Sequence, residues 1–249
     1  MSSTRSPSRR AQAIKRSAII VSHGQPSDPL PAEADLKALS AKVAGHLPDW
    51  LVTSATLANP GALDAALAAT DGTPLIYPLF MTDGWFVRSA LPKRLGDAPA
   101  HILPPLGVEP DLPDLVATHL CDALAGREWA PQATTLLVAS HGSGRSPKSK
   151  QATEAFVAKL GAAMRFAGIR TGYVEEAPFF GDVAMGCRGQ TLCLPFFAAY
   201  GGHVKDDITD ALSVADFKGA LLDPIGTFQT IPAFVAKSLR KAARSQVTA

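Results

Sequence analysis

The sequence predicts an α/β protein built from two tandem-duplicated halves, each a parallel β-sheet flanked by helices, with the active-site cleft between the halves. One observation is a near-repeat, because residues 18–24 read Ala-Ile-Ile-Val-Ser-His-Gly and residues 136–142 read Leu-Leu-Val-Ala-Ser-His-Gly, with His23 and His141 118 positions apart. A second is that short apolar runs alternate with helical periodicity in both halves. A third is that prolines and glycines recur at separations of 117 to 119, namely Pro60 and Pro178, Pro78 and Pro195, Pro105 and Pro224, Gly107 and Gly226, and Pro113 and Pro232.

The second half shows the alternation of strands and helices most clearly. The run Thr-Thr-Leu-Leu-Val-Ala at 134–139 has the apolar character of a buried strand. After Pro147, the apolar residues Phe156 and Leu160 lie at helical spacing. Strands are predicted at 134–139, 170–175, 190–197 and 218–222, and helices at 148–166, 180–188, 203–214 and 231–243. The first half follows the same order.

The repeat and the charge distribution together define the domain organisation. We expect an N-terminal half over 17–125, a linker near 126–133 and a C-terminal half over 134–243. Residues 1–16 hold five basic residues and no acid, which is typical of a disordered, solvated tail. Between the basic ends, 17–236 hold 15 basic and 22 acidic residues, a net charge of −7 that argues against a nucleic-acid partner.

The composition points to a globular protein of the cytoplasm. Of the 249 residues, 47% are hydrophobic and 18% are charged, with no uncharged apolar run long enough for a transmembrane helix and no secretory signal pattern. The three cysteines are too few for a disulfide framework or a structural zinc cluster. We therefore expect no membrane partner and a reducing compartment.

Polar side chains follow the strands of the second half. His141 comes directly after the first strand, Glu175 ends the second, and His203 follows the third. The carboxyl ends of parallel strands share one edge of a sheet, which is where such folds bind ligands. Two histidines and a carboxylate suit a first-row divalent metal and can also accept protons near neutral pH. Glu176 is the alternative to Glu175 if the strand register differs by one residue.

The first half lacks most of these polar groups. His23 matches His141, but the proline alignment puts Phe86 opposite His203. We expect the second half to supply the polar chemistry and the first half a more apolar wall, which would suit a flat aromatic ligand. The same alignment places Leu57 and Ala58 opposite Glu175 and Glu176.

Several other aromatic residues and histidines are expected to stabilise the fold and not to bind a ligand. Trp85 and Phe86 are expected in the core more readily than in a ligand wall, and His46, His101 and His119 in hydrogen-bonding or capping roles. The Gly142-Ser143-Gly144-Arg145 segment fits neither the phosphate loop nor the dinucleotide fingerprint, and there is no Gly-x-Ser-x-Gly elbow.

These segments together resemble a known family. A strand ending in Ser-His-Gly-Ser at 140–143, a Glu-Glu-Ala-Pro segment at 175–178 and Gly-Gly-His-Val-Lys-Asp-Asp-Ile at 201–208 resemble the class II chelatases. The similarity is greatest to the sirohydrochlorin cobaltochelatase/ferrochelatase (CbiX/SirB) type in its long, two-half form, and it covers about residues 17–240. It implies ATP-independent insertion of Co²⁺ or Fe²⁺ into sirohydrochlorin, in cobalamin or siroheme biosynthesis.

The resemblance also implies roles for individual residues. His141 and His203 match the metal-binding and proton-accepting pair, and Glu175 the nearby acid. Long members generally carry the pair in the N-terminal half, whereas here it is C-terminal. The metal is expected as a substrate, with no tightly bound cofactor. The carboxylate-rich macrocycle should be bound by Ser143, Arg145, Lys148 and Lys205, together with Arg88 and His23 from the first half.

Two other classes remain open at this point. One is a non-catalytic carrier of a tetrapyrrole or metal, and the other is a hydrolase that uses the histidine pair to hold a metal. The sequence leaves open whether cobalt, iron or nickel is the metal, and whether the protein is a monomer or a homodimer.

Overall fold

The computed structural model describes residues 16–247 and contains two four-stranded sheets, all of whose strand pairs are parallel. The first sheet has the order β2-β1-β3-β4 and the second the matching order β6-β5-β7-β8. The two-half α/β fold is thus confirmed. The strands are β1 (Arg16–Ser22), β2 (Trp50–Thr56), β3 (Leu75–Pro78), β4 (His101–Ile102), β5 (Thr135–Ser140), β6 (Gly168–Tyr173), β7 (Thr191–Pro195) and β8 (Ala220–Leu221).

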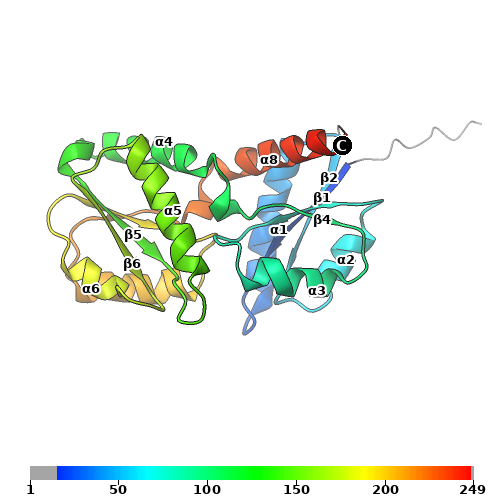
Figure 1. The fold of residues 1–249 in the computed structure, drawn as a ribbon, viewed down its shortest axis with the longest axis horizontal. Helices are drawn as coiled ribbons and strands as arrows, with labels where there is room; N and C mark the ends of the chain where they lie inside the picture. Colours follow the sequence, from blue (N-terminus) through cyan, green and yellow to red (C-terminus); the bar gives the residue numbers. More distant parts are fainter. Residues whose placement is uncertain (1–15, 248–249) are drawn as a thin grey trace, which may run out of the picture.

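Helices connect successive strands and cover both faces of each sheet (Figure 1). The α-helices are α1 (Pro29–Gly45), α2 (Ala62–Ala68), α3 (Leu91–Leu95), α4 (Leu112–Ala125), α5 (Lys148–Ala163), α6 (Phe180–Met185), α7 (Thr209–Val214) and α8 (Ile231–Val247). Two π-helices in the described residues, η1 (Phe86–Ala90) and η4 (His203–Ile208), continue directly into α3 and α7. Short 3₁₀ turns are η2 (Leu106–Val108), η3 (Pro131–Ala133) and η5 (Ile225–Thr227).

The central strands are apolar on both faces because both faces are covered. In β1, Ala18 and Ile20 belong to one apolar cluster, while Ile19 and Val21 point to the other face and belong to a second. The same alternation divides β5, whose Leu137 lies in a third cluster beneath α6 and α7. Successive side chains of a strand point to opposite faces, so one short run contributes to two cores.

The two halves exchange their last helices. In sequence, α4 ends the first half, yet it packs along α5 of the second half, whereas α8 packs on α1 and β3 of the first half (Figure 1). Exposed polar contacts accompany the exchange, because Lys237 of α8 donates to Asp111 at the start of α4 over 2.8 Å and Arg240 donates to the carbonyl of His46. The packed bodies therefore differ from the sequence repeats 17–125 and 134–243.

One continuous apolar core results from this exchange. Leu120 of α4 and Leu239 of α8 are both fully buried, and they belong to the same cluster as Ile20 of β1 and Val138 of β5. The inner faces of the two sheets are consequently joined through the exchanged helices, and the halves are fixed against each other by apolar burial rather than by a flexible linker.

Several boundaries differ from the predicted ones. The strand predicted over 218–222 is only two residues long, Ala220–Leu221, and the helix predicted from 203 to 214 begins as the π-helix η4. Arg16, grouped with the N-terminal tail, opens β1 and pairs with Trp50, while residues 1–15 lie outside the described residues. No helix within residues 16–247 is both long and apolar enough to cross a membrane.

The contact of His119 with Phe228 predicts an acid-sensitive stability. The rings stack at 3.7 Å, and burial lowers the pKa of His119 below its ordinary 6.5 more than Asp122 and Asp223 raise it. The unfolded chain therefore binds the proton first as pH falls, so this stabilisation is present above pH 6.5 and is lost as pH falls toward the folded-state pKa. We expect H119F, which keeps an aromatic ring, to lose less unfolding free energy than the parent between pH 7.5 and 5.5 in urea titrations. His23 contributes equally to both proteins, so equal losses would contradict the prediction.

Candidate metal and substrate site

Three polar side chains converge at the carboxyl edge of the second sheet. His141 follows β5, Glu175 follows β6, and His203 opens the π-helix that comes after β7. One ligand atom from each lies within 4.8 Å of the other two. The imidazole rings of His141 and His203 stand 4.4 Å apart and nearly perpendicular, at 80°. The predicted convergence of these three residues is therefore present.

The loop after β5 is held in place by contacts that leave no room for a larger residue at Gly142. Gly142 has a φ of +71°, and a Cβ there would lie 2.8 Å from the Cβ of Tyr173 and 2.9 Å from the Cγ of Glu176. The Glu176 carboxylate accepts a hydrogen bond of 2.8 Å from the backbone N–H of Ser143. Glu176 thus fixes the loop, whereas Glu175 is the carboxylate that faces the histidine pair.

Both histidines have their Nδ1 atoms engaged. Nδ1 of His141 lies 2.8 Å from the carbonyl oxygen of Gly142, and Nδ1 of His203 lies 2.6 Å from Oδ2 of Asp207. Carbonyl and carboxylate oxygens only accept, so Nδ1 carries the proton in each ring. In the neutral imidazoles, the Nε2 lone pairs are then left for a metal or a proton.

The site is open to solvent. His141 and Glu175 are exposed, and the His203 side chain is 38% exposed. A solvent-exposed site with three protein ligands differs from the closed four-ligand sites that hold structural zinc. Such an arrangement can bind a divalent ion and leave coordination positions for another molecule.

The first half repeats this geometry without its chemistry. The His23 ring lies 4.3 Å from Phe86, the first residue of η1, just as His141 lies against His203, the first residue of η4. Burial, with a smaller effect from the positive charge of Arg94, lowers the pKa of His23. A neutral imidazole beside a phenyl ring makes this position markedly less polar than its counterpart.

The backbone register corrects one pairing between the halves. The N–H of Ala58 donates to the carbonyl of His23, and the N–H of Glu175 donates to the carbonyl of His141. Ala58 is therefore opposite Glu175, whereas the proline spacing had placed Leu57 there. Leu57 corresponds to Val174, because the two halves differ in loop length between this strand end and the aligned prolines.

Of the predicted substrate-binding cations, Lys148 and Arg88 meet at one loop. Nζ of Lys148, at the start of α5, donates to the carbonyl of Asp83 across the two halves at 3.4 Å. Nε of Arg88 lies 2.7 Å from both carboxylate oxygens of the same Asp83. The rims of the two halves therefore touch beside η1, near the loop that carries His141.

Arg145 and Lys205 are exposed on the second half and, within residues 16–247, take part in no ion pair. Ser143 accepts a hydrogen bond of 3.2 Å from the backbone N–H of Arg145, so its hydroxyl contributes to the turn.

Trp85 lies where the sequence did not place it. The expectation of a core position is wrong for this residue, because its side chain is 66% exposed. Phe86 beside it is half-buried and contacts the rings of His23, Phe80 and Trp85. A large exposed aromatic group next to the loop of Asp83 is therefore available to a ligand.

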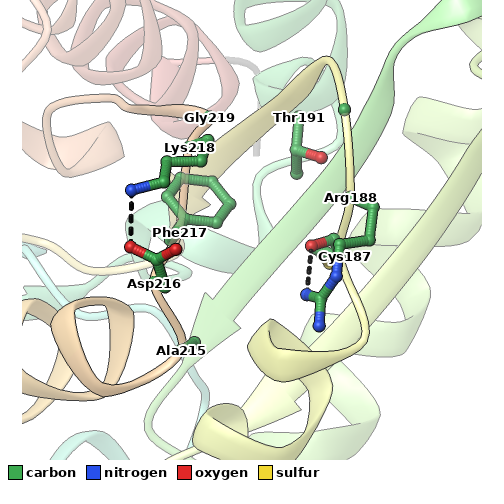
Figure 2. Close-up of a pocket in the computed structure, with 9 residues that line it drawn as sticks. Cys187, Arg188, Thr191, Ala215, Asp216, Phe217, Lys218 and Gly219 are labelled. Atoms are coloured by element: carbon green, nitrogen blue, oxygen red, sulfur yellow. Dashed lines mark hydrogen bonds and ion pairs between the residues drawn. The ribbon is translucent and has the colours of Figure 1, made fainter.

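A cavity of about 200 Å³ lies away from this site, at the amino ends of β7 and β8 (Figure 2). Its wall includes Thr191, the first residue of β7, and Gly219, which precedes β8. Lys218 there is paired with Asp216, and the Arg188 guanidinium donates to the carbonyl of Cys187 (Figure 2). This cavity is separate from the histidine cluster because it opens at the opposite edge of the sheet.

Comparison with solved structures identifies the family. A structure of CbiX, described as the terminal enzyme for biosynthesis of siroheme in denitrifying bacteria, is 44% identical, with a TM-score of 0.84 over 91% of this chain and 99% of that one. The chain belongs to the CbiX family. The CbiX family model matches residues 135–242, the half that contains His141, Glu175 and His203. No match was found among curated protein sequences.

Two structures of SirB share the fold at lower sequence identity. SirB from Bacillus subtilis with Fe³⁺ is 15% identical, with a TM-score of 0.72 over 93% of this chain and 97% of that chain. SirB from Bacillus subtilis subspecies spizizenii in complex with cobalt is also 15% identical, with a TM-score of 0.67 over 92% and 96%. At this identity the likeness establishes the common architecture alone.

The sequence pattern identified neither Asp207 as a partner of His203 nor Glu176 as the residue that holds the loop after β5. Asp207 lies four residues after His203, so a helix beginning at His203 would have placed both on one face. Glu176 was considered only as a substitute for Glu175. Its contact with the Ser143 N–H joins segments far apart in sequence, and nothing in the local pattern indicates it.

The two glycines after His23 and His141 allow a matched test of the site. Gly24 has a φ of +75° and a Cβ there would lie 2.7 Å from the Cβ of Thr56, so G24A and G142A impose the same backbone strain. We expect each to lower the free energy of unfolding by about 1–3 kcal/mol. Only G142A displaces the loop of His141, so only G142A should weaken Co²⁺ binding, by roughly tenfold or more. Equal Co²⁺ affinities in the two variants would contradict the placement of the site.

Proposed function

We propose that this CbiX-family chain inserts a divalent metal, Co²⁺ or Fe²⁺, into a tetrapyrrole, with sirohydrochlorin as the macrocycle, without ATP. The observation that carries the proposal is the open cluster of His141, Glu175 and His203, whose ligand atoms lie within 4.8 Å of one another. It stands in a chain 44% identical to a CbiX of siroheme biosynthesis. The product would serve siroheme or cobalamin synthesis.

The chemistry requires both a metal-binding group and a proton acceptor. When a divalent ion enters the macrocycle, two pyrrole N–H protons must leave, so that the metal replaces them in the ring. The two unprotonated Nε2 atoms and the Glu175 carboxylate can hold the ion through few ligands and then release it. Once the ion has moved into the ring, the same nitrogens can accept the departing protons. Glu175 would compensate the charge while the ion is bound and relay protons to solvent.

The macrocycle would lie between the chemistry of the second half and the apolar wall of the first. Trp85 and Phe86 offer aromatic surface on the rim that touches Lys148 through Asp83. Arg145 and Lys205 would bind peripheral carboxylates directly, for which a guanidinium is well suited. Arg88 is paired with Asp83 and would have to exchange that partner for a substrate carboxylate. Ser143 and His23 would complete the contacts.

The remaining properties of the protein belong to the same proposal. The metal acts as a substrate and no tightly bound cofactor is required, since both metal ligation and proton transfer are assigned to side chains. We place the reaction in the cytoplasm, with the protein acting as a monomer or a homodimer.

Replacement of His203 by alanine should reduce insertion most strongly. The variant H203A loses a metal ligand and a proton acceptor together, so we expect the rate of Co²⁺ insertion into sirohydrochlorin, followed anaerobically by absorbance, to fall by at least about 10²-fold. H101A is the control, because His101 is exposed at the start of β4, on the opposite edge of the first sheet. Unchanged turnover in H203A would contradict the assignment.

The reaction itself is tested by offering Co²⁺, Fe²⁺ and Ni²⁺ with sirohydrochlorin and related macrocycles under anaerobic conditions. Many equivalents of metallated product per protein are expected for at least one pair. A spectral change that stops at one equivalent would instead indicate a carrier. A carrier is compatible with the apolar residues that the first half has in place of the polar groups. Hydrolysis of model esters without insertion would indicate a metal-dependent hydrolase.

Trp85 should contribute to binding of the macrocycle and not to binding of the metal. Its exposed indole can stack on a flat conjugated ring, and we expect W85A to raise the KM for sirohydrochlorin about tenfold with little change in kcat, whereas W85F keeps most of the affinity. The measurement is steady-state insertion at varied macrocycle concentration, with a Co²⁺ titration in the absence of macrocycle as the control. An unchanged KM in W85A would remove Trp85 from the binding wall.

A further inference from the structure

We propose that Asp207 is a positioning residue for His203, holding its imidazole so that Nε2 is the atom presented to the metal and to the macrocycle. This inference rests on the proposed function, since it concerns the same site. It adds a residue outside the three that converge as ligands.

The contact between the two side chains is short and local. Nδ1 of His203 and Oδ2 of Asp207 are 2.6 Å apart, and the two residues lie four positions apart within the single π-helix η4. The side chains are 38% and 52% exposed, so neither is confined by burial. In a ring free to rotate about its side-chain bonds, either nitrogen could face the site. The carboxylate therefore selects the orientation.

The same contact selects the position of the proton. A carboxylate accepts and cannot donate, so the His203 proton must be on Nδ1. His141 reaches the same state through a neutral acceptor, the carbonyl of Gly142 at 2.8 Å. A backbone carbonyl is fixed by the loop, but His203 has no such carbonyl at its Nδ1 and depends on a side chain. Partners of this kind orient metal-binding histidines in many proteins.

The first half provides an internal comparison. In η1, Phe86 occupies the position of His203, and Ala90, which is 4% exposed, occupies the position of Asp207. The carboxylate is thus present in the half that has the histidine and absent from the half that has a phenylalanine. If Asp207 served only to stabilise the π-helix, η1 would need an equivalent group, yet it forms the same kind of helix with alanine there.

Helix stability gives little alternative explanation for Asp207. An exposed pair at a spacing of four residues adds little to the stability of a helix. Asp206, the adjacent residue, carries the same charge and is also exposed. Among the hydrogen bonds and ion pairs of the described residues, the Asp207 carboxylate contacts only His203. Asp206 is therefore a matched control for the loss of one negative charge from η4.

The test compares D207A, D207N and D206A in the full-length protein, with Co²⁺ affinity measured by absorption titration without macrocycle. Loss of a group that orients a ligating histidine typically weakens metal binding by roughly 10- to 100-fold, and we expect that loss in D207A. D207N should recover much of the affinity, because its amide oxygen can still accept from Nδ1–H. D206A should bind as the parent does.

A second measurement reports the proton position directly. In the metal-free protein, ¹⁵N NMR of the His203 ring, assigned by its absence in H203A, should show the Nδ1–H tautomer in the parent and in D206A and a mixture of tautomers in D207A. Equal Co²⁺ affinity in D207A and D206A, or an unchanged tautomer in D207A, would overturn the proposal. If D207A does not fold, as judged by circular dichroism, D207L replaces it, because leucine also has no acceptor for the Nδ1–H. Weaker Co²⁺ binding and a mixture of tautomers in D207L, with both properties retained in D207N, would support the proposal. Parent-like affinity and tautomer in D207L would overturn it.

These readouts separate this inference from the proposed function. Both use the metal or the ring nitrogen alone and require no insertion of metal into a macrocycle. If the parent protein bound Co²⁺ but metallated no macrocycle, the chelatase proposal would fail, while the role of Asp207 would still be decided by affinity and tautomer.

Discussion

The burial of α4 and α8 in the opposite halves is the interaction on which the rest of the structure depends. Leu120 and Leu239 are fully buried members of one apolar cluster, and this cluster reaches the inner faces of both sheets. Truncation of a large buried apolar side chain costs about 2–5 kcal/mol, so each exchanged helix, with several buried apolar residues, contributes a large share of the stability of a domain of this size. Because the two sheets are fixed through this core, their carboxyl edges are fixed as well. The contact of Lys148 with the carbonyl of Asp83 joins the rims of the two halves in the geometry that the core imposes.

Within this symmetric frame the chemistry is asymmetric. The turn after β1 and the turn after β5 have the same glycine conformation and the same backbone hydrogen bond to the neighbouring strand end. The side chains on the two frames differ, since Glu175, His203 and Asp207 correspond to Ala58, Phe86 and Ala90. Three polar groups, of which Asp207 contacts His203 and Glu175 lies beside it, are thus replaced together by apolar ones. One duplicated backbone thus carries a polar edge in the second half and a more apolar edge in the first.

Much of the fold could be predicted from sequence because it is encoded locally. Apolar runs identified the central strands, and the repeat of Ser-His-Gly identified the duplication. The convergence of His141, Glu175 and His203 followed from a general property of parallel sheets, namely that strand ends share an edge. The exchange of helices could not be predicted, because the periodicity of α4 and α8 shows that each has an apolar face but not which sheet that face covers. The correspondence of Ala58 to Glu175 was missed by one residue, because the spacing of prolines in loops depends on loop length and not on strand register. The exposure of Trp85 was missed because an indole is compatible with a core or with a ligand surface.

The exchange of the last helices also determines the order in which the molecule can be completed during synthesis. The helix that covers α1 and β3 is α8, formed by Ile231–Val247, so the first sheet is translated long before the segment that closes its inner face. Helix α4, in turn, is translated before the second sheet, against which it packs. Neither half can reach its final packing as a separate unit in the usual N-terminal-first sequence. Closure of the core that joins the two sheets therefore requires the chain through α8, whereas the cluster that contains Ile19 and Val21 is formed by first-half residues alone.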